Sequence, residues 1–417
     1  MAKPTIRFRG FDDEWEQRKL GNVLFSLQNN TLSRANLSDE SGIAKNVHYG
    51  DVLIKFGEVL DVRKEKLPMI TDENVLSKYK ASFLQNGDVI VADTAEDSTV
   101  GKCSEIAGLN DEVVLSGLHT IPYRPIEKFA SGYLGYYLNS GAYHNQLIPL
   151  MQGIKVTSIS KSAMQNTDID YPKSQEEQGK IGAYFKSLDE MITLHQRKCD
   201  ETKKLKKYML QKMFPQNGSK VPEIRFKGFT DEWEQRKLGE VFEQTSNLVN
   251  PKEDEIELWS LTVEDGLTKK SDRYNREFLV KKDDNFKEVR PGDIVYNPMN
   301  MTLGAVGYNG MAKSVAVSGY YTTMVTKENY DTYYINTWLK SPQAIQLYRT
   351  YATGSLIEKQ RVQFPTLSII PVAFPKYEEQ TKIGSYFDSL DNLITLHQHK
   401  CEELKKLKKF MLQNMFA

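Results

Sequence analysis

The feature that most constrains the fold is a long segment that occurs twice. Residues 176–214 return as residues 378–416, 202 positions later, with 29 of 39 positions identical. Its apolar residues recur at alternating spacings of four and three, which is typical of a helix that buries one seam. They are Ile181, Phe185, Leu188, Ile192, Leu205 and Met209, with His195 and Cys199 between them. Two such segments in one chain predict two long helices packed on each other.

Each copy is long enough to form one uninterrupted helix. No glycine or proline lies between Ala183 and Phe214, and Pro215 follows the first copy. At 1.5 Å per residue, about 36 residues form a helix roughly 54 Å long. Antiparallel packing of the copies would bring the start and the end of the chain together. We therefore predict an antiparallel coiled coil.

A second repeat opens each half of the chain. Pro4–Gly21 returns as Pro222–Gly239, offset by 218, with 15 of 18 positions identical. We call these segments the opening strips. Trp15 and Trp233 lie in them and are expected to be apolar anchors. The repeating unit is therefore an opening strip, a variable domain and a long helix.

The two variable segments, residues 22–175 and 240–377, diverge but keep short landmarks in the same order. The landmarks correspond in three pairs, which are Gly87–Val91 with Gly292–Tyr296, Ser116–Thr120 with Ser318–Thr322, and Gly153 with Gly354. Gly153 and Gly354 each precede a polar loop that contains a basic residue. Common landmarks around different contents predict two domains of one fold.

The fold class we expect is α+β. Short β-branched runs at Val89–Val91, Val113–Leu115 and Val315–Val317 predict strands, and residues 131–146 and 330–348 show helical patterns. The expected division is a first domain over residues 1–175, a helix over 176–215, a second domain over 216–377 with its strip at 222–239, and a second helix over 378–417.

Composition excludes several classes of protein. The 417 residues carry 55 basic and 55 acidic side chains, so no overall basic excess argues for nucleic-acid binding. The three cysteines are too few for a disulfide framework, and no apolar run or leader predicts a membrane span or secretion. We expect a cytoplasmic protein without contact to a membrane.

The sequence offers little catalytic chemistry. Gly101-Lys102-Cys103 lacks the first glycine and the hydroxyl residue of a phosphate-binding loop, and Asn297-Pro298 is only half of an adenine-methyltransferase motif. We therefore predict no catalytic residues and no cofactor bound by this chain.

The seam itself holds one possible metal site. His195 and Cys199 are four residues apart, as are His397 and Cys401. Two Cys and two His form the ligand set of a structural zinc site. The same residues also serve as ordinary seam residues that fix register, so both interpretations stay open and no metal is predicted.

With both repeats in view, the chain resembles the specificity subunits of type I restriction-modification systems over nearly its whole length. The resemblance rests on the duplicated opening strips, on the Gly87-Asp88-Val89 and Gly292-Asp293-Ile294 landmarks, and on the Glu-Glu-Gln start of each long helix at Glu176 and Glu378. It implies two target recognition domains in a pseudo-twofold arrangement, separated by the helices as a coiled-coil spacer. Each domain would read one half of a bipartite site in double-stranded DNA.

The resemblance also implies partners. Two methyltransferase subunits would dock on the helices and modify adenine, and two restriction subunits would join for cleavage. S-adenosylmethionine, ATP and Mg²⁺ would be bound by those partners. Residues flanking the seam are the expected docking contacts, namely Tyr184, Met191, Tyr386 and Leu393.

By the same resemblance, contacts to DNA should come from loops between the landmarks. Side chains there that can pair with base edges or hold phosphates are Lys55, Arg63, Lys64, Thr94, Lys102, His119 and Lys155 in the first domain, and Thr262, Lys269, Lys270, Arg273, Asn297, Tyr320, Lys359 and Arg361 in the second.

Three other functions remain open from the sequence. A stand-alone bipartite DNA-binding or architectural protein would bind tightly without partners. An enzyme with a site between its domains would show nuclease or methyltransferase activity by itself. A purely structural scaffold would leave unexplained why similar landmarks enclose such different contents.

Overall fold

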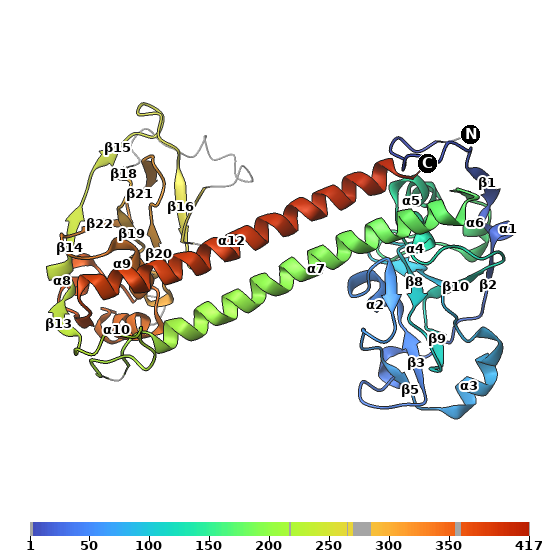
Figure 1. Ribbon diagram of the computed structural model, residues 1–417, viewed down its shortest axis with the longest axis horizontal. Coiled ribbons are helices and arrows are strands. Elements are labelled where there is room, and N and C mark those ends of the chain that lie inside the picture. Colours follow the sequence, from blue (N-terminus) through green and yellow to red (C-terminus); the bar gives the residue numbers. More distant parts are fainter. Residues whose placement is uncertain (1–2, 217, 265, 270–284, 355–359, 417) are drawn as a thin grey trace. The chain divides into compact units, whose positions relative to one another are not determined.

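The computed structural model describes residues 3–216, 218–264, 266–269, 285–354 and 360–416 (Figure 1). The chain forms two compact units. Unit 1 comprises Met1–His195 with His399–Ala417, and unit 2 comprises Gln196–Gln398. Each of the two longest helices therefore contributes one half to each unit.

Unit 1 is built on a five-stranded sheet in the order β2-β10-β6-β8-β4, in which β10 pairs antiparallel with β2 and β6. Two-stranded pairs β1-β12 and β7-β11 and a small sheet β5-β3-β9 complete it. The strands are β1 Glu16–Lys19, β2 Leu24–Ser26, β3 Ala44–Val47, β4 Val59–Asp61, β5 Met69–Ile70, β6 Val89–Ala92, β7 Thr94–Ala95, β8 Cys103–Ala107, β9 Val114–Ser116, β10 Thr120–Pro125, β11 Thr157–Ser158 and β12 Asp168–Tyr171. The short helices are α1 Leu20–Val23, α2 Tyr49–Ile54, α3 Glu73–Tyr79, α4 Tyr133–Leu138, α5 Gly141–Leu147 and α6 Lys161–Gln165.

Unit 2 repeats this plan with a four-stranded sheet in the order β14-β22-β19-β20, accompanied by β15-β18-β21, β13-β23 and β16-β17. The strands are β13 Glu234–Lys237, β14 Phe242–Thr245, β15 Leu248–Val249, β16 Trp259–Thr262, β17 Gly266–Lys269, β18 Phe286–Val289, β19 Ile294–Tyr296, β20 Val306–Tyr308, β21 Val315–Ser318, β22 Thr322–Thr326 and β23 Pro371–Phe374. The short helices are α8 Leu238–Val241, α9 Thr332–Leu339, α10 Pro342–Tyr351 and α11 Phe364–Ser368. The predicted α+β class and the three predicted strands are confirmed.

The two repeated segments form α7, Gln175–Lys212, and α12, Tyr377–Asn414, each 38 residues long (green and red in Figure 1). In unit 1 the rings of Phe185 and Phe416 stack with centroids 5.6 Å apart, and in unit 2 those of Phe214 and Phe387 stack at 6.0 Å. In both cases the end of one helix meets the early part of the other. The predicted antiparallel packing is thus confirmed within each unit.

The predicted seam is wrong at one position. Leu205 is 44% exposed and does not lie in the seam. Strict alternation of four and three from Cys199 leads instead to Thr202 and Lys206, both half-buried. Lys206 fits there because its ammonium group pairs with the carboxylate of Asp391 on α12. A search for apolar residues at regular spacing cannot identify a seam position that is filled by a paired lysine.

Each opening strip is held to the ends of the long helices. The Arg7 guanidinium forms a bidentate ion pair with the Glu177 carboxylate, with N–O distances of 2.6 and 2.9 Å. Arg225 forms the same bidentate ion pair with Glu379, and both of its N–O distances are 2.7 Å. The Ile6 amide also donates to the Asn414 carbonyl over 2.8 Å, which brings the start and the end of the chain together as predicted. Trp15 and Trp233 are buried in the two main apolar clusters, so their expected role as anchors is confirmed.

Both predicted mid-domain helices are broken in two. The pattern over 131–146 becomes α4 and α5, and that over 330–348 becomes α9 and α10. Ser140 and Ser341 are extended residues at the breaks, and the Ser341 hydroxyl accepts from the Ala344 amide as an N-terminal cap. Because Pro342 has no amide hydrogen, it fits the first turn of the new helix and not the interior of one long helix.

The start of the first of these helices is capped differently in the two units. In unit 2 the Asp331 side chain accepts from the Tyr334 amide at the start of α9. In unit 1 Gly132 precedes α4, and the cap comes from β8, where Glu105 accepts from the amides of Gly132 and Gly135 at 2.6 and 3.0 Å. Burial raises the pKa of Glu105 to about 7. The common fold is therefore held by different side chains in each unit.

Candidate nucleic-acid interface

In unit 1, three segments that are distant in sequence meet at one end of the main sheet. β6 ends and β10 begins there, with Ala92 opposite Thr120. The Asp93 amide donates to the His119 carbonyl over 3.1 Å, and the Ile159 amide donates to the Asp93 carbonyl over 2.9 Å. β11 also pairs with β7. The structure thus brings together Thr94, His119 and the loop that carries Lys155.

The side chains at this end of unit 1 form a polar and aromatic group. The Thr94 hydroxyl donates to Asp93 over 2.8 Å, and His119 Nδ1 lies 3.6 Å from the same carboxylate. The His119 backbone has φ 55°, and the Tyr49 ring meets its imidazole edge-on at 5.3 Å. The His48 ring also lies next to Tyr49, with ring centroids 4.7 Å apart, and burial lowers the pKa of His48. Half of the His119 side chain remains exposed to solvent.

Sequence reasoning missed three members of this group, Asp93, Tyr49 and its neighbour His48. Asp93 could have been found, because it directly precedes Thr94 and follows the buried strand of the Gly87 landmark. Tyr49 gave no signal, because it lies 70 positions from His119 and only the fold joins them.

The other four residues expected in unit 1 lie around the end of α2. Lys55 donates to the Lys66 carbonyl, and Arg63 and Lys64 are exposed and share Asp61, at 3.3 and 3.8 Å. Lys102 differs from them. Its ammonium group is half-buried and donates to the Leu53 carbonyl over 2.8 Å, and burial lowers its pKa. Lys102 thus ties α2 to the sheet.

Unit 2 presents the corresponding end of its sheet. Tyr296 on β19 lies opposite Thr322 on β22, which places Asn297 and the Tyr320 turn together. The Val362 amide donates to the Pro298 carbonyl over 2.9 Å, as Ile159 does to Asp93 in unit 1. Arg361 is exposed beside this bond, and its backbone pairs with Thr353. Tyr320 is 89% exposed.

Of the remaining residues expected to contact DNA in unit 2, some lie on one hairpin and the others lie outside the described residues. Thr262 and Lys269 lie on the β16–β17 hairpin, where Lys269 is 3.4 Å from Glu257. Lys270, Arg273 and Lys359 lie outside the described residues.

The residues expected to dock partners fall into two kinds. Tyr184 and Tyr386 are half-buried because each packs edge-on against a phenylalanine of the opening strip, Phe8 at 6.2 Å and Phe226 at 6.0 Å. Met191 and Leu393 occupy equivalent positions of the two helices and are 39% and 44% exposed.

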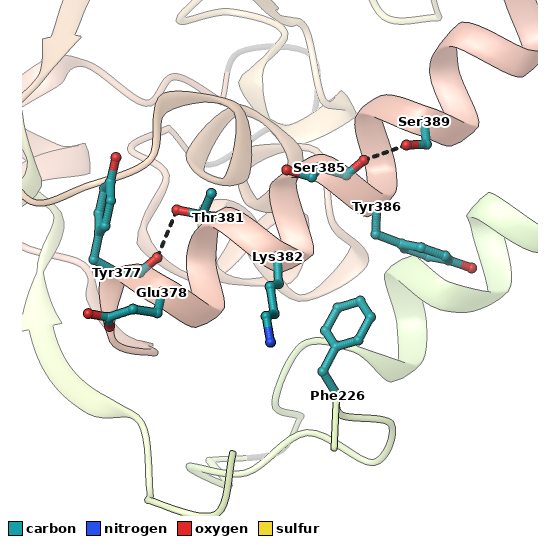
Figure 2. Close-up of a pocket in the computed structure, with 8 residues that line it drawn as sticks. All are labelled: Phe226, Tyr377, Glu378, Thr381, Lys382, Ser385, Tyr386 and Ser389. Carbon is teal, nitrogen blue, oxygen red and sulfur yellow. Dashed lines mark hydrogen bonds between the residues drawn. The ribbon is translucent and has the colours of Figure 1, made fainter. Parts of the chain in front are cut away.

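Tyr386 borders a shallow groove of ≈ 570 Å³ in unit 2 (Figure 2). Two hydroxyls in it bond to carbonyls of their own helix, Thr381 to Tyr377 over 3.0 Å and Ser389 to Ser385 over 2.8 Å, so the groove offers mainly carbon surface. Its lining residues are Phe226, Tyr377, Glu378, Thr381, Lys382, Ser385, Tyr386 and Ser389.

By the geometry of its side chains and the hydropathy of its helices, the described part of the chain holds neither a metal site nor a membrane span. It contains no group of three or more His, Cys, Asp or Glu side chains placed to hold a metal ion. Cys199 and Cys401 are buried. Of the helices in the described ranges, none is both long and apolar enough to cross a bilayer.

Comparisons with known proteins identify the family. The model of the family described as "Type I restriction modification DNA specificity domain" matches residues 12–204 and again residues 230–406. The S subunit of a type I restriction-modification system from M. genitalium has a crystal structure with TM-score 0.62 to this chain, at 13% identity, covering 100% of this chain and 99% of that one.

Two other solved structures are similar over their length. One, described as showing complex assembly and conformational transition of the type I R-M system, has 17% identity and TM-score 0.49, covering 96% of this chain and 97% of that one. The HsdS subunit from Thermoanaerobacter tengcongensis has 17% identity and TM-score 0.46, covering 97% and 96%. No curated protein matched. Because the family model matches both halves, the chain belongs to the family of type I restriction-modification DNA specificity subunits.

Proposed function

We propose that this chain selects the DNA target of a type I restriction-modification complex, and that each unit reads one half of a split sequence. One observation carries the proposal, namely that a single DNA specificity family matches both halves while their loops differ. The same fold presents the same three segments at the end of the main sheet in both units. Different side chains on equivalent segments suit two unlike half-sites.

The long helices are proposed to set the gap between the half-sites. Each has 38 residues and is therefore about 57 Å long. Half-sites one duplex turn apart are separated by roughly 34 Å, and a pair of packed helices fixes such a distance where a flexible linker does not. Inserting one heptad into both helices would change the gap and leave the half-sites unchanged.

The complex supplies the chemistry. We propose that two methyltransferase subunits bind S-adenosylmethionine and modify adenine, and that two restriction subunits use ATP and Mg²⁺ to cleave. This chain contributes the choice of site and is expected in the cytoplasm, where its target DNA lies.

The test is the pattern of adenine methylation in cells that express the chain with its methyltransferase partner. We expect one new split motif that is absent without this chain. Exchange of residues 22–175 for those of a relative should change one half of the motif and keep the other half and the gap. If methylation is unchanged although the two proteins copurify, the specificity role is wrong. Target-specific binding by the chain alone, together with failure to copurify, would favour a stand-alone DNA-binding protein.

The exposed basic side chains at the sheet ends should matter for binding. Lys155→Ala and Arg361→Ala are each expected to weaken binding of the complex to its target by about 1 to 3 kcal/mol, because each removes a cation near DNA. Lys128→Ala, an exposed lysine beyond the other end of β10, is the control. Fluorescence anisotropy with a target duplex measures the effect. Full affinity in both variants would remove these loops from the interface.

The repeated helix positions are proposed as docking contacts for two copies of one partner. Met191→Glu combined with Leu393→Glu should reduce copurification of the methyltransferase subunit about tenfold or more, because each places a charge in an apolar contact. Thr193→Glu combined with Thr395→Glu is the matched control, since a step of two residues turns about 200° around a helix. Equal copurification of both double variants would move the docking surface elsewhere.

A further inference from the structure

The most exposed large apolar side chain in the described part of the chain lies on the loop between Gln152 and Ser158, whose base pairs with the Thr94 segment. Ile154 is 102% exposed and Val156 is 54% exposed, with Lys155 between them. Isolated apolar side chains on a surface need no explanation. Here two of them flank a lysine at the tip of one short loop.

The loop holds these side chains in a defined place. The amides and carbonyls of Gln152 and Ser158 bond to each other in both directions, at 2.9 and 2.8 Å, and so close the loop at its base. Gly153 has φ 117°, and a Cβ there would lie 1.9 Å from the Val156 carbonyl oxygen. Only glycine allows this tight path. The tip is therefore shaped by the backbone and not by burial of its own apolar residues.

The side chains near the tip favour binding of a polyanion such as DNA. β11 follows the loop and pairs with β7, where Ser158 is opposite Thr94, and the half-exposed imidazole of His119 is within 3.5 Å of Thr94. Residues 150–166 include Lys155 and Lys161 and no carboxylate. The Asp93 carboxylate also lies here, where it accepts from the Thr94 hydroxyl over 2.8 Å and is 3.6 Å from His119 Nδ1, so it occupies these two side chains and not the tip. An apolar tip that carries an exposed lysine and lies beside hydroxyls matches the edge of a base pair next to a phosphate.

We propose that Ile154, supported by Val156, reads the methyl group of thymine in the half-site of unit 1. The C5-methyl of thymine is the apolar group that base pairs display in the major groove, and side chains with aliphatic carbons contact it. Lys155 then holds an adjacent phosphate and fixes the depth of the tip. The inference rests on the proposed function and names the base that this unit recognises.

Replacement of thymine by uracil tests the proposal, because it removes only the methyl group. The duplex carries the target found by methylation mapping, with uracil for thymine in both strands of the half-site of unit 1. The full chain with its methyltransferase partner should bind this duplex about fourfold more weakly, the effect of one buried methyl group. The Ile154→Ala complex should bind thymine DNA more weakly by a similar factor and should not respond to uracil.

Two controls separate the possible failures. Ile126→Ala, an exposed isoleucine just past the far end of β10, should respond to uracil as the unaltered protein does. If Ile154→Ala keeps the full fourfold response, Ile154 does not read the methyl group and the inference is wrong. A response to uracil that is absent in every protein also overturns it. Equal binding to a duplex with a scrambled first half-site would instead contradict the proposed function.

Discussion

Arg7→Met is expected to destabilise unit 1 by about 3 to 5 kcal/mol. Glu177, at the start of α7, has a side chain only 1% exposed, and the guanidinium of Arg7 is its ionic partner through two bonds. A weaker contact from Trp15 Nε1, 3.4 Å away, cannot neutralise the carboxylate. Methionine fills much of the arginine's volume but leaves a buried charge uncompensated.

The experiment separates the charge from the packing. Native-state hydrogen exchange of the amides in β1 and β12 follows unit 1 without requiring the whole chain to unfold in one step. Arg9→Met, in the exposed part of the same strip, should change protection little. The double variant Arg7→Met with Glu177→Leu should recover most of the loss, because no charge is left buried. A double variant as unstable as the single one would show that the strip is held by shape and not by this ion pair. Arg225→Met should destabilise unit 2 in the same way, through Glu379.

Lys408→Met is also expected to destabilise unit 1, by about 3 kcal/mol at neutral pH. Lys408 lies on α12 and is 14% exposed, with Asp189 at 2.6 Å and Glu58 at 2.7 Å. Burial raises the pKa of Asp189 even with this lysine beside it, and the Tyr136 hydroxyl donates to the same carboxylate over 2.8 Å. Without the ammonium group, two close carboxylates would repel each other.

The pH dependence follows from the direction of that pKa. A carboxyl whose pKa is higher in the folded state than in the unfolded state binds a proton more tightly when folded, so stability falls as pH rises through the interval between the two values. Loss of Lys408 raises the folded pKa further and widens the interval. The deficit of the variant should therefore shrink as the pH is lowered. Lys406→Met, exposed on the same helix, is the control, and a deficit independent of pH would exclude the electrostatic explanation.

The corresponding change in unit 2 should be milder. Lys206 pairs with Asp391, which also accepts from Tyr333 over 2.8 Å, and there is no described counterpart of Glu58 at this lysine. Lys206→Met therefore leaves one carboxylate without its ammonium partner, whereas Lys408→Met leaves two. The difference between the stability losses of the two variants measures how far the residues packed against the two nearly identical helices have diverged.

The sequence by itself determined the repeat and what the repeat requires. Two long helices, their seam except at Leu205, and the strips anchored by Trp15 and Trp233 could be predicted, because periodicity and internal identity are properties of the chain. The resemblance to the specificity subunits rests on the same residues. The chemical types suited to DNA contact could also be picked out, but not which of them would meet.

Only the tertiary structure decided which side chains come together. Thr94, His119 and Lys155 lie on three segments that meet because β6 ends, β10 begins and β11 pairs with β7 at one place, whereas Lys102 is turned inward to a backbone carbonyl. The seam position of Lys206 depended on Asp391, which is 185 residues away. Such pairings are fixed by packing between distant segments, and composition and local periodicity carry no information about which distant partner a charge will find.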